Sequence, residues 1–291
     1  MTITIGTHPN NLSTWLLSHR VELQQQLDDV AGGVEWIRYT DGRETVKRFR
    51  DSTIDVGATG TTPPIIAQAD GLDVAYIAIS EPHPDNGGLV VPADSPLHTV
   101  ADLAGRGVAF ASGSWQTQAL AIALDNAGLQ WSDITVVDLH AIASGEDFVE
   151  SGAESWFLVD PTYTQLTELV ETRTLVQTAE LVKNRSVFWG RGDYVRRNPD
   201  TIDAFVQALD ATDQWASNNL DETIDILIHN GRGDNPETWR RALAHRGWGV
   251  HTIDDEFIAE QQAAADLFHR FGISNSAVDV RHIVRPFVSR R

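Results

Sequence analysis

Hydrophobic positions along the chain recur at two spacings, and these spacings predict strands and helices that follow one another. Short apolar or alternating segments predict strands at residues 2–6, 34–40, 54–60, 74–80, 89–91, 107–110, 133–139, 155–161, 174–177 and 186–190. Segments with helical spacing lie between them, at residues 15–27, 41–50, 61–71, 115–127 and 145–151. Because strands and helices alternate, we expect an α/β protein with largely parallel sheets.

The order of these segments also predicts two lobes. One series of strands and helices ends near residue 88, and a second series begins directly after it. Beyond residue 190 the chain becomes mainly helical, with helices expected at residues 199–217, 221–230, 236–246 and 254–271. Ligands bind in open α/β sheets beyond the carboxyl ends of the strands, so the turns at those ends are candidate sites.

One such turn lies in GVAFASGSWQT, residues 107–117, where a strand, a Ser/Gly turn and a helix follow one another. The first N–H groups of a helix lack intrahelical partners and lie at the positive end of its dipole, so this turn can hold an anion. Ser114 is the expected N-cap, and Ser112 and Thr117 add hydroxyl groups. An ordinary βα turn with a serine cap is the alternative.

Two further strand ends have the same chemistry. GTHPN follows the first strand, and ATGTTPP follows the third, where Thr62 is the expected N-cap and Pro63 and Pro64 occupy the first helical positions. Three turns of one kind in corresponding positions favour a binding site over three unrelated turns.

Composition narrows the classes of ligand and mechanism. The 291-residue chain carries a formal net charge of −19, which argues against a nucleic-acid surface or adhesion to an anionic membrane, since both need clustered Lys and Arg. A pocket with local dipoles can still bind a small anion. The chain has no cysteine, which excludes disulfides, thiolate nucleophiles and cysteine metal sites. Its ten histidines form no HExxH motif, and neither a metal site nor a cofactor is expected.

The chain also lacks recognisable membrane and export signals. No apolar run is long enough for a transmembrane helix, and the first strand begins directly after Met1 without the segments of a signal peptide. As written, the chain is expected to be cytoplasmic, unless a leader precedes it.

Five separated blocks resemble one family. They are IDVGATGTTPPIIAQADG, LVVPADSPLHTVADLAGRGVAFASGSWQ, ESWFLVDPTY, KNRSVFWGRGDYVRRNPD and GVHTIDDEFIAEQQAAADLF, in family order within a match from Thr2 to about Val284. In these blocks the chain resembles the aliphatic-sulfonate-binding family of ABC-transporter substrate-binding proteins, which is related to taurine- and nitrate-binding proteins.

The resemblance implies a two-lobed periplasmic-binding-protein fold of type II, with a ligand cleft between the lobes. Lobe one would comprise residues 1–88 and 190–291, and lobe two residues 89–189. Two crossover strands near residues 89–92 and 186–190 would join the lobes, which close around an anionic ligand. The family implies a location in the periplasm or cell envelope. We expect a monomer that works with an ABC permease if it is exported.

The resemblance carries ligand-binding residues over block by block. They are His8, Asn10, Thr59, Gly60, Thr61, Thr62, Gly113, Ser114, Trp115, Gln116, Trp156, Asp160, Arg185 and Trp248. Hydroxyl and backbone donors satisfy the oxygens of a sulfonate, and aromatic rings cover an aliphatic tail. Several of these residues have structural alternatives: His8 as a polar loop residue, Asp160 as a strand end, Arg185 as a partner of a hinge carboxylate, and Trp115 and Trp248 as core aromatics.

Position 61 departs from the family pattern. Relatives usually carry an acidic residue where this chain has Thr61. Loss of the carboxylate favours an anionic ligand and removes a possible partner for an amino group, which argues against taurine-like ligands.

Two classes of function follow. The main hypothesis is a receptor that captures a small sulfonate-like anion and delivers it to a permease. The alternative is a cytoplasmic enzyme of the lyase or hydrolase type, or an intracellular carrier, that acts on a small sulfonate, sulfinate or carboxylate. Desulfinases of this fold need a cysteine nucleophile, so an enzyme here would use His8 or Asp160 for acid–base chemistry. The missing leader favours the enzyme or the carrier, whereas the unbroken family match and the absence of a catalytic constellation favour the receptor.

Overall fold

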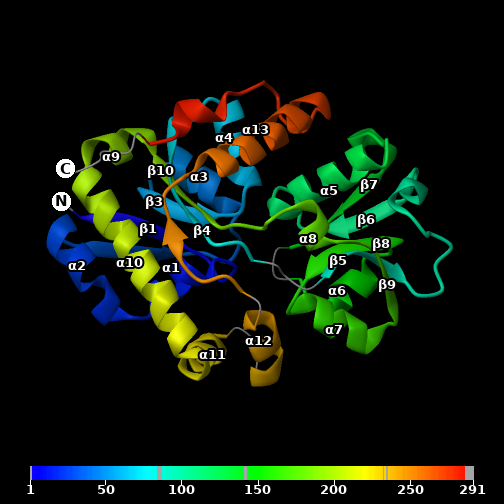
Figure 1. Ribbon diagram of the computed structural model, residues 1–291, viewed down its shortest axis with the longest axis horizontal. Coiled ribbons are helices and arrows are strands. Elements are labelled where there is room, and N and C mark those ends of the chain that lie inside the picture. The colour runs from blue at the N-terminus through cyan, green and yellow to red at the C-terminus, as the bar shows by residue number, and fades with distance from the viewer. Residues whose placement is uncertain are drawn as a thin grey trace.

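The computed structural model describes residues 2–83, 87–140, 143–231, 233, 235–244 and 246–285. Its elements form two groups that lie side by side (Figure 1). One group contains both the blue N-terminal part and the yellow-to-red C-terminal part of the chain, and the green middle part forms the other. We call these groups lobe one and lobe two.

Lobe one is built on a sheet of six described strands in the order β11-β4-β10-β3-β1-β2. The parallel strands β1, β2 and β3 pair at one side, and β10 runs antiparallel between β3 and β4. The described bounds are β1 (Ile3–Thr7), β2 (Val34–Arg38), β3 (Val56–Thr59), β4 (Val74–Ser80), β10 (Val187–Arg191) and β11 (Val250–His251).

Helices cover both faces of this sheet, because its central strands are apolar on both sides. Ile5, Phe188 and Phe205 belong to the core under α2 and α10, whereas Tyr76, Trp189 and Phe268 belong to the core under α3, α4 and α13. The helices of lobe one are α1 (Leu12–Leu17), α2 (Val21–Ala31), α3 (Glu44–Arg50), α4 (Thr62–Ala69), α9 (Gly192–Arg197), α10 (Pro199–Asn218), α11 (Leu220–His229), α12 (Pro236–Leu243), α13 (Asp255–Arg270) and the 3₁₀ helix η3 (Val280–Ile283).

Lobe two has a five-stranded sheet in the order β7-β6-β8-β5-β9 among the described residues. Phe110, Leu120 and Phe157 fill the core on the side of α5, and Phe148 and Leu166 fill the core on the side of α6 and α7. The elements are β5 (Gly87–Pro92), η1 (Val100–Leu103), β6 (Gly107–Phe110), α5 (Trp115–Asn126), η2 (Trp131–Asp133), β7 (Thr135–Asp138), α6 (Gly145–Glu150), β8 (Ser155–Val159), α7 (Thr162–Leu169), β9 (Thr172–Gln177) and α8 (Thr178–Leu181).

Two local predictions are wrong: the single helix at residues 15–27 and the N-cap at Thr62 in the ATGTTPP turn. The helix expected at residues 15–27 is two helices, because Ser18 Oγ and His19 Nδ1 both bond to the Trp15 carbonyl, at 2.8 and 2.7 Å, and end α1. Thr62 is the first residue of α4 and Thr61 is its N-cap, without a side-chain cap bond. The short helices α7, α8 and α9 and the two-residue strand β11 were not predicted, since such short segments carry little periodicity.

The chain crosses between the sheets twice, and the two crossings are bonded to each other. The first crossing follows β4 at Ser80, and the second precedes β10 at Val187. Ser80 N–H donates to the Ser186 carbonyl at 3.0 Å, Ser186 N–H donates to Ser80 Oγ at 2.9 Å, and His83 N–H donates to the Lys183 carbonyl at 3.1 Å. We therefore propose lobe boundaries in these crossings, which would move residues 87–88 into lobe two and residues 187–189 into lobe one, relative to the boundaries expected at residues 88 and 189.

Candidate functional site

A cavity of about 220 Å³ lies between the lobes, at the bonded crossings. It is slightly smaller than the range of about 300–1,000 Å³ that is usual for ligand pockets. The segments that follow β1 and β3 line it from lobe one, and those that follow β6 and β8 line it from lobe two. The segments after β2 and β7, helix α6, the crossings and α12 contribute the other wall residues. The carboxyl ends of the strands therefore meet at one cavity, as the turn chemistry predicted.

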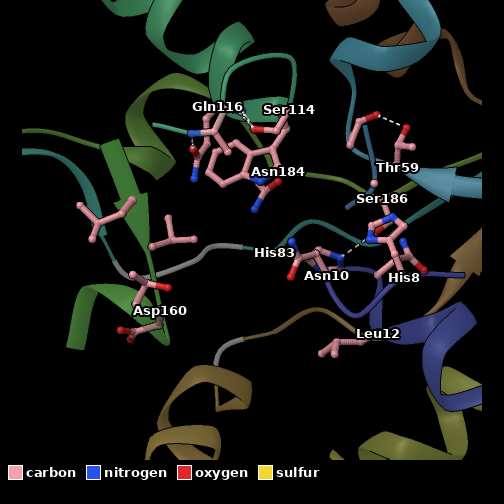
Figure 2. Close-up of a pocket in the computed structure, with 18 of the residues that line it drawn as sticks. His8, Asn10, Leu12, Thr59, His83, Ser114, Gln116, Asp160, Asn184 and Ser186 are labelled. Carbon is pink, nitrogen blue, oxygen red and sulfur yellow. Dashed lines mark hydrogen bonds between the residues drawn. The ribbon is translucent and has the colours of Figure 1, made fainter. Parts of the chain in front are cut away.

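The two lobe-one turns hold their polar groups in fixed positions. His8 is buried, and its Nε2 lies 2.9 Å from the carbonyl oxygen of Ala58. Thr59 Oγ1 donates to the Gly60 carbonyl at 2.8 Å and accepts from Trp189 Nε1 at 3.1 Å. Figure 2 shows Thr59, His8 and Asn10 on one side of the cavity. Rigid side chains of this kind lose little entropy when a ligand binds.

The lobe-two turn caps α5 as predicted. Ser114 Oγ accepts from Gln116 N–H at 3.2 Å and donates to the Ala111 carbonyl at 2.7 Å. Gln116 Oε1 in turn accepts from Ala111 N–H at 2.8 Å, and Gly113 N–H donates to Thr117 Oγ1 at 2.8 Å. Several donors that were expected to face an anion are therefore used inside the turn, which makes the turn rigid and leaves fewer backbone N–H groups for a ligand.

Basic side chains reach the cavity from lobe one and from the second crossing. Arg185 is buried, donates to the Ser80 carbonyl at 3.1 Å and lies 3.7 Å from the Glu256 carboxylate. The guanidinium carbon of Arg246 lies 4.8 Å from the ring centroid of Trp248. Burial, together with the charges of Arg246 and Arg185, lowers the pKa of His83 well below its ordinary value, so this histidine is neutral at pH 7.

The carboxylates that line the cavity are engaged by neighbours. Burial alone would raise the pKa of Asp41, but hydrogen bonds from Arg43 outweigh it and lower this pKa, so the group is ionised and paired. Asp160 Oδ1 accepts from Thr164 N–H at 3.0 Å and from Thr164 Oγ1 at 2.7 Å. The guanidinium groups of Arg43, Arg185 and Arg246 thus bring positive charge to this cavity in a chain with a net charge of −19.

The rest of the wall is apolar. Leu12, Trp239 and Leu243 belong to one buried cluster of lobe one, and Phe148 and Leu158 belong to a cluster of lobe two. All five line the cavity. Figure 2 shows Leu12 on the opposite side of the cavity from Ser114, Gln116 and Asn184. The cavity wall therefore combines polar and apolar side chains, which suits a ligand with a charged head and a hydrocarbon tail.

The structure brings nine of the fourteen residues proposed from the resemblance to the cavity wall. They are His8, Asn10, Thr59, Gly60, Ser114, Trp115, Gln116, Asp160 and Arg185. Their contact with a ligand stays a prediction.

The other five residues are not part of the cavity wall. They are Thr61, Thr62, Gly113, Trp156 and Trp248. The carbonyl of Thr61 accepts from Gln261 Nε2 at 2.7 Å, and Thr62 is fully buried. Trp156 packs in the core beside Phe148 because its strand is covered on both faces. Trp248 lies beneath Arg246. Thr61 therefore has no direct part in the cavity wall.

Sequence reasoning missed Arg43, His83, Arg246 and α12, which all contribute to the wall. Arg246 directly precedes the GWGV segment, residues 247–250, which the first crossing holds in place: Gly247 N–H donates to the Pro82 carbonyl at 3.1 Å. No local pattern in the sequence indicates that contact. Within the described residues, no group of three or more His, Cys, Asp or Glu side chains could hold a metal ion. The same part of the chain contains no helix with the length and apolar character of a membrane span.

Comparison with known proteins agrees with this geometry. The model of the family described as NMT1/THI5 like matches residues 33–223, which is more than half of the chain. An Escherichia coli (strain K12) protein named as an aliphatic sulfonates-binding protein is 28% identical over 249 residues, which cover 85% of this chain and 78% of that protein.

Two solved structures share the fold over nearly the whole chain. The periplasmic aliphatic sulphonate binding protein SsuA from Escherichia coli superposes with a TM-score of 0.87 at 26% identity, covering 100% of this chain and 94% of that one. The alkanesulfonate-binding protein SsuA from Xanthomonas axonopodis pv. citri, bound to MOPS, gives a TM-score of 0.85 at 27% identity, covering 98% of each chain. The predicted α/β class and the periplasmic-binding-protein fold are confirmed.

Proposed function

We propose that this chain, which belongs to the NMT1/THI5-like family, is a solute-binding protein that captures a small sulfonate-like organic anion for an ABC importer. Its relatives in Escherichia coli and Xanthomonas axonopodis are named for binding aliphatic sulfonates and alkanesulfonates. The function is uptake, and the cavity between the lobes is where the ligand is held.

One observation carries this proposal: the wall of the cavity combines basic and polar side chains with apolar ones. A sulfonate has three acceptor oxygens and one delocalised charge, so side-chain amides, hydroxyls and guanidinium groups suit it. The apolar side chains of Leu12, Leu243 and Phe148 in the wall suit a short hydrocarbon tail. A volume of about 220 Å³ supports a small ligand rather than a polymer or a large cofactor.

The partner and the oligomeric state are narrower parts of the proposal. An ABC permease would receive the ligand from the closed form of the protein, and the protein would act as a monomer of 32.0 kDa. Light scattering on protein that elutes from a size-exclusion column measures that mass directly. A stable dimer would contradict the proposed monomer.

An enzyme that uses His8 or Asp160 remains the alternative. Both side chains line the cavity, but His8 Nε2 is engaged by the Ala58 carbonyl and Asp160 by Thr164. These bonds support structural roles. Conversion of a bound sulfonate, sulfinate or carboxylate that is lost in His8→Ala would establish the enzyme instead.

A thermal-shift screen tests the proposal. Alkanesulfonates, taurine, sulfate esters, nitrate and carboxylates are added singly to ligand-free protein. A ligand at 100 times its Kd stabilises the folded state by about 2.7 kcal/mol, which raises the Tm of a chain of this size by about 5 °C. Stabilisation by alkanesulfonates is the expected result. No shift with any sulfonate would contradict the proposal.

A further inference from the structure

Arg43 connects the two lobes through several bonds at once. It precedes α3 in lobe one, where its Nε donates to Asp41 Oδ2 at 2.8 Å. Its Nη1 reaches across to lobe two and donates to both carboxylate oxygens of Asp138, at 2.9 and 3.0 Å, and to the Ser112 carbonyl at 3.1 Å. One guanidinium group therefore holds atoms from both sides of the cavity.

Asp138 connects the same group to the turn that lines the cavity. It is the last residue of β7, and its Oδ1 accepts from Ser112 N–H at 2.9 Å. Ser112 lies two residues before Ser114, the cap of α5, which is part of the cavity wall. Arg43, Asp138 and the Ser112 backbone thus form a closed set of bonds, and we call this set the interlobe latch.

The latch lies at the rim of the cavity. The side chain of Arg43 is 27% exposed and lines the cavity, whereas that of Asp138 is 53% exposed and lies outside the wall. Because the two residues belong to different lobes, any separation of the lobes at this rim must break the bonds between them. Asp138 can therefore influence the closed form without touching a ligand.

Asp41 fixes the lobe-one half of the latch. Its carboxylate is largely buried and lies 2.6 Å from Arg43 Nη2, while His140 Nε2 lies 3.6 Å from the same oxygen. The hydrogen bond to Asp41 raises the pKa of Arg43, although burial alone would lower it. The guanidinium group is thus charged and already oriented toward lobe two, which reduces the entropy lost when the lobes close.

We infer that the Arg43–Asp138 latch stabilises the closed form of the protein and thereby slows release of the bound anion. The inference rests on the proposed function as a solute-binding protein. Asp138 acts as a positioning residue through Arg43 and the Ser112 turn. Breaking the latch raises the ligand's dissociation rate and leaves its association rate nearly unchanged, because most of the ligand-free protein is open and the latch is formed only in a minor closed population.

Asp138→Asn tests this inference with little other disturbance. The asparagine carbonyl can still accept from Ser112 N–H, so the turn keeps its bond, whereas the charge that attracts Arg43 is lost. Asp73→Asn is the matched control: Asp73 is similarly exposed and makes a two-bond pair with Arg196, at 2.9 and 2.6 Å, but both of these residues lie in lobe one.

Dissociation of 1-butanesulfonate is measured by stopped flow for the wild type and both variants. We expect Asp138→Asn to raise the dissociation rate by about fivefold, the factor expected for an exposed ion pair of good geometry, and Asp73→Asn to leave it unchanged. Raising the ionic strength from about 0.01 M to about 1 M should speed release from the wild type more than from Asp138→Asn, because salt screens the pair. Equal rates for Asp138→Asn and the wild type, or equal effects of the two variants, would overturn the inference.

A second measurement tests the latch without a ligand. The chain has no cysteine, so Val21→Cys on α2 and Val149→Cys on α6 place one label on each lobe at exposed positions. In ligand-free protein, a minor population with short spin-label distances should be present in the wild type and in Asp73→Asn and should be lost in Asp138→Asn. An unchanged distribution in Asp138→Asn would overturn the latch. Absence of sulfonate binding by the wild type would contradict the proposed function but would leave this distance test intact.

Discussion

Gly60 is the position where a single methyl group should hold the lobes apart. A Cβ atom built on Gly60 would lie 2.6 Å from the Cβ atom of Trp115, which belongs to the other lobe. That distance is about 1 Å shorter than an ordinary carbon–carbon contact. Both atoms are close to the backbone, so rotating a side chain cannot relieve the clash. In Gly60→Ala the two turns must move apart by roughly this amount.

The cost of that movement falls on the closed form. Inserting a methyl group into a tightly packed contact costs about 1–3 kcal/mol, which corresponds to an increase in Kd of about 5- to 150-fold. A shift of about 1 Å would also lengthen the 2.9 Å bond between Arg43 and Asp138 beyond hydrogen-bonding distance. The ligand-free Tm should change little, because the open form has room for the methyl group.

Isothermal titration with 1-butanesulfonate measures the loss of affinity, and X-ray scattering of the liganded protein measures closure. Gly57→Ala is the matched control: it lies on β3, three residues before Gly60, and its Cβ would meet its nearest neighbour, Thr45 Cγ2, at an ordinary 3.4 Å within lobe one. An affinity of Gly60→Ala within twofold of the wild type would show that the contact between Gly60 and Trp115 does not limit closure of the lobes. An equal loss in Gly57→Ala would show this as well.

Three further predictions concern the tail, the cap and pH. In a series of straight-chain alkanesulfonates, each added methylene should lower the Kd about fourfold until the cavity of about 220 Å³ is full, because burying a methylene contributes about 0.8 kcal/mol. Equal Kd values across the series in calorimetry would contradict an apolar site for the tail. Ser114→Ala should lose a helix cap worth about 1 kcal/mol and lower the Tm by about 2–4 °C in calorimetry, whereas Ser114→Thr should retain most of it. Burial raises the pKa of Tyr39 to about 12, and an unfolded tyrosine ionises near 10, so this group's contribution to stability is present below pH 10 and is lost as the pH rises toward 12. Tyr39→Phe should therefore reduce the alkaline fall in the free energy of unfolding, measured with urea, by up to about 1.4 kcal/mol per pH unit, and an unchanged slope would count against it.

The positions of the turns that line the cavity were predictable, because such turns follow the carboxyl ends of parallel strands. The ends of β1 and β3 meet at one edge of the lobe-one sheet because these strands are parallel neighbours, whereas the turn after β6 lies at an edge of the lobe-two sheet. Asn10, Thr59 and Ser114 line one cavity because the cavity lies between the two lobes. The N-cap of Ser114 follows from local bonding alone, which explains why the sequence predicted it. Local chemistry of this kind needs no knowledge of distant residues.

Other parts of the cavity depend on contacts between distant segments. Arg246 reaches the cavity because Gly247 approaches the first crossing closely: a Cβ on Gly247 would lie 2.4 Å from the Pro82 carbonyl oxygen. Trp156 faces a helix-covered side of its sheet, and a strand covered on both faces gives no alternation that tells one buried side from the other. The short α7 and α8 are likewise defined by packing on β8 and β9 rather than by their own periodicity.

The cavity should bind an organic anion through its sulfonate group, and calorimetry on ligand-free protein can show whether it does. Titration with 1-butanesulfonate is compared with titration of n-butylammonium, which has the same tail and the opposite charge. We expect saturable one-to-one binding of the sulfonate and no measurable binding of the ammonium ion. Equal binding of both ions, or no heat from any alkanesulfonate, would contradict this expectation.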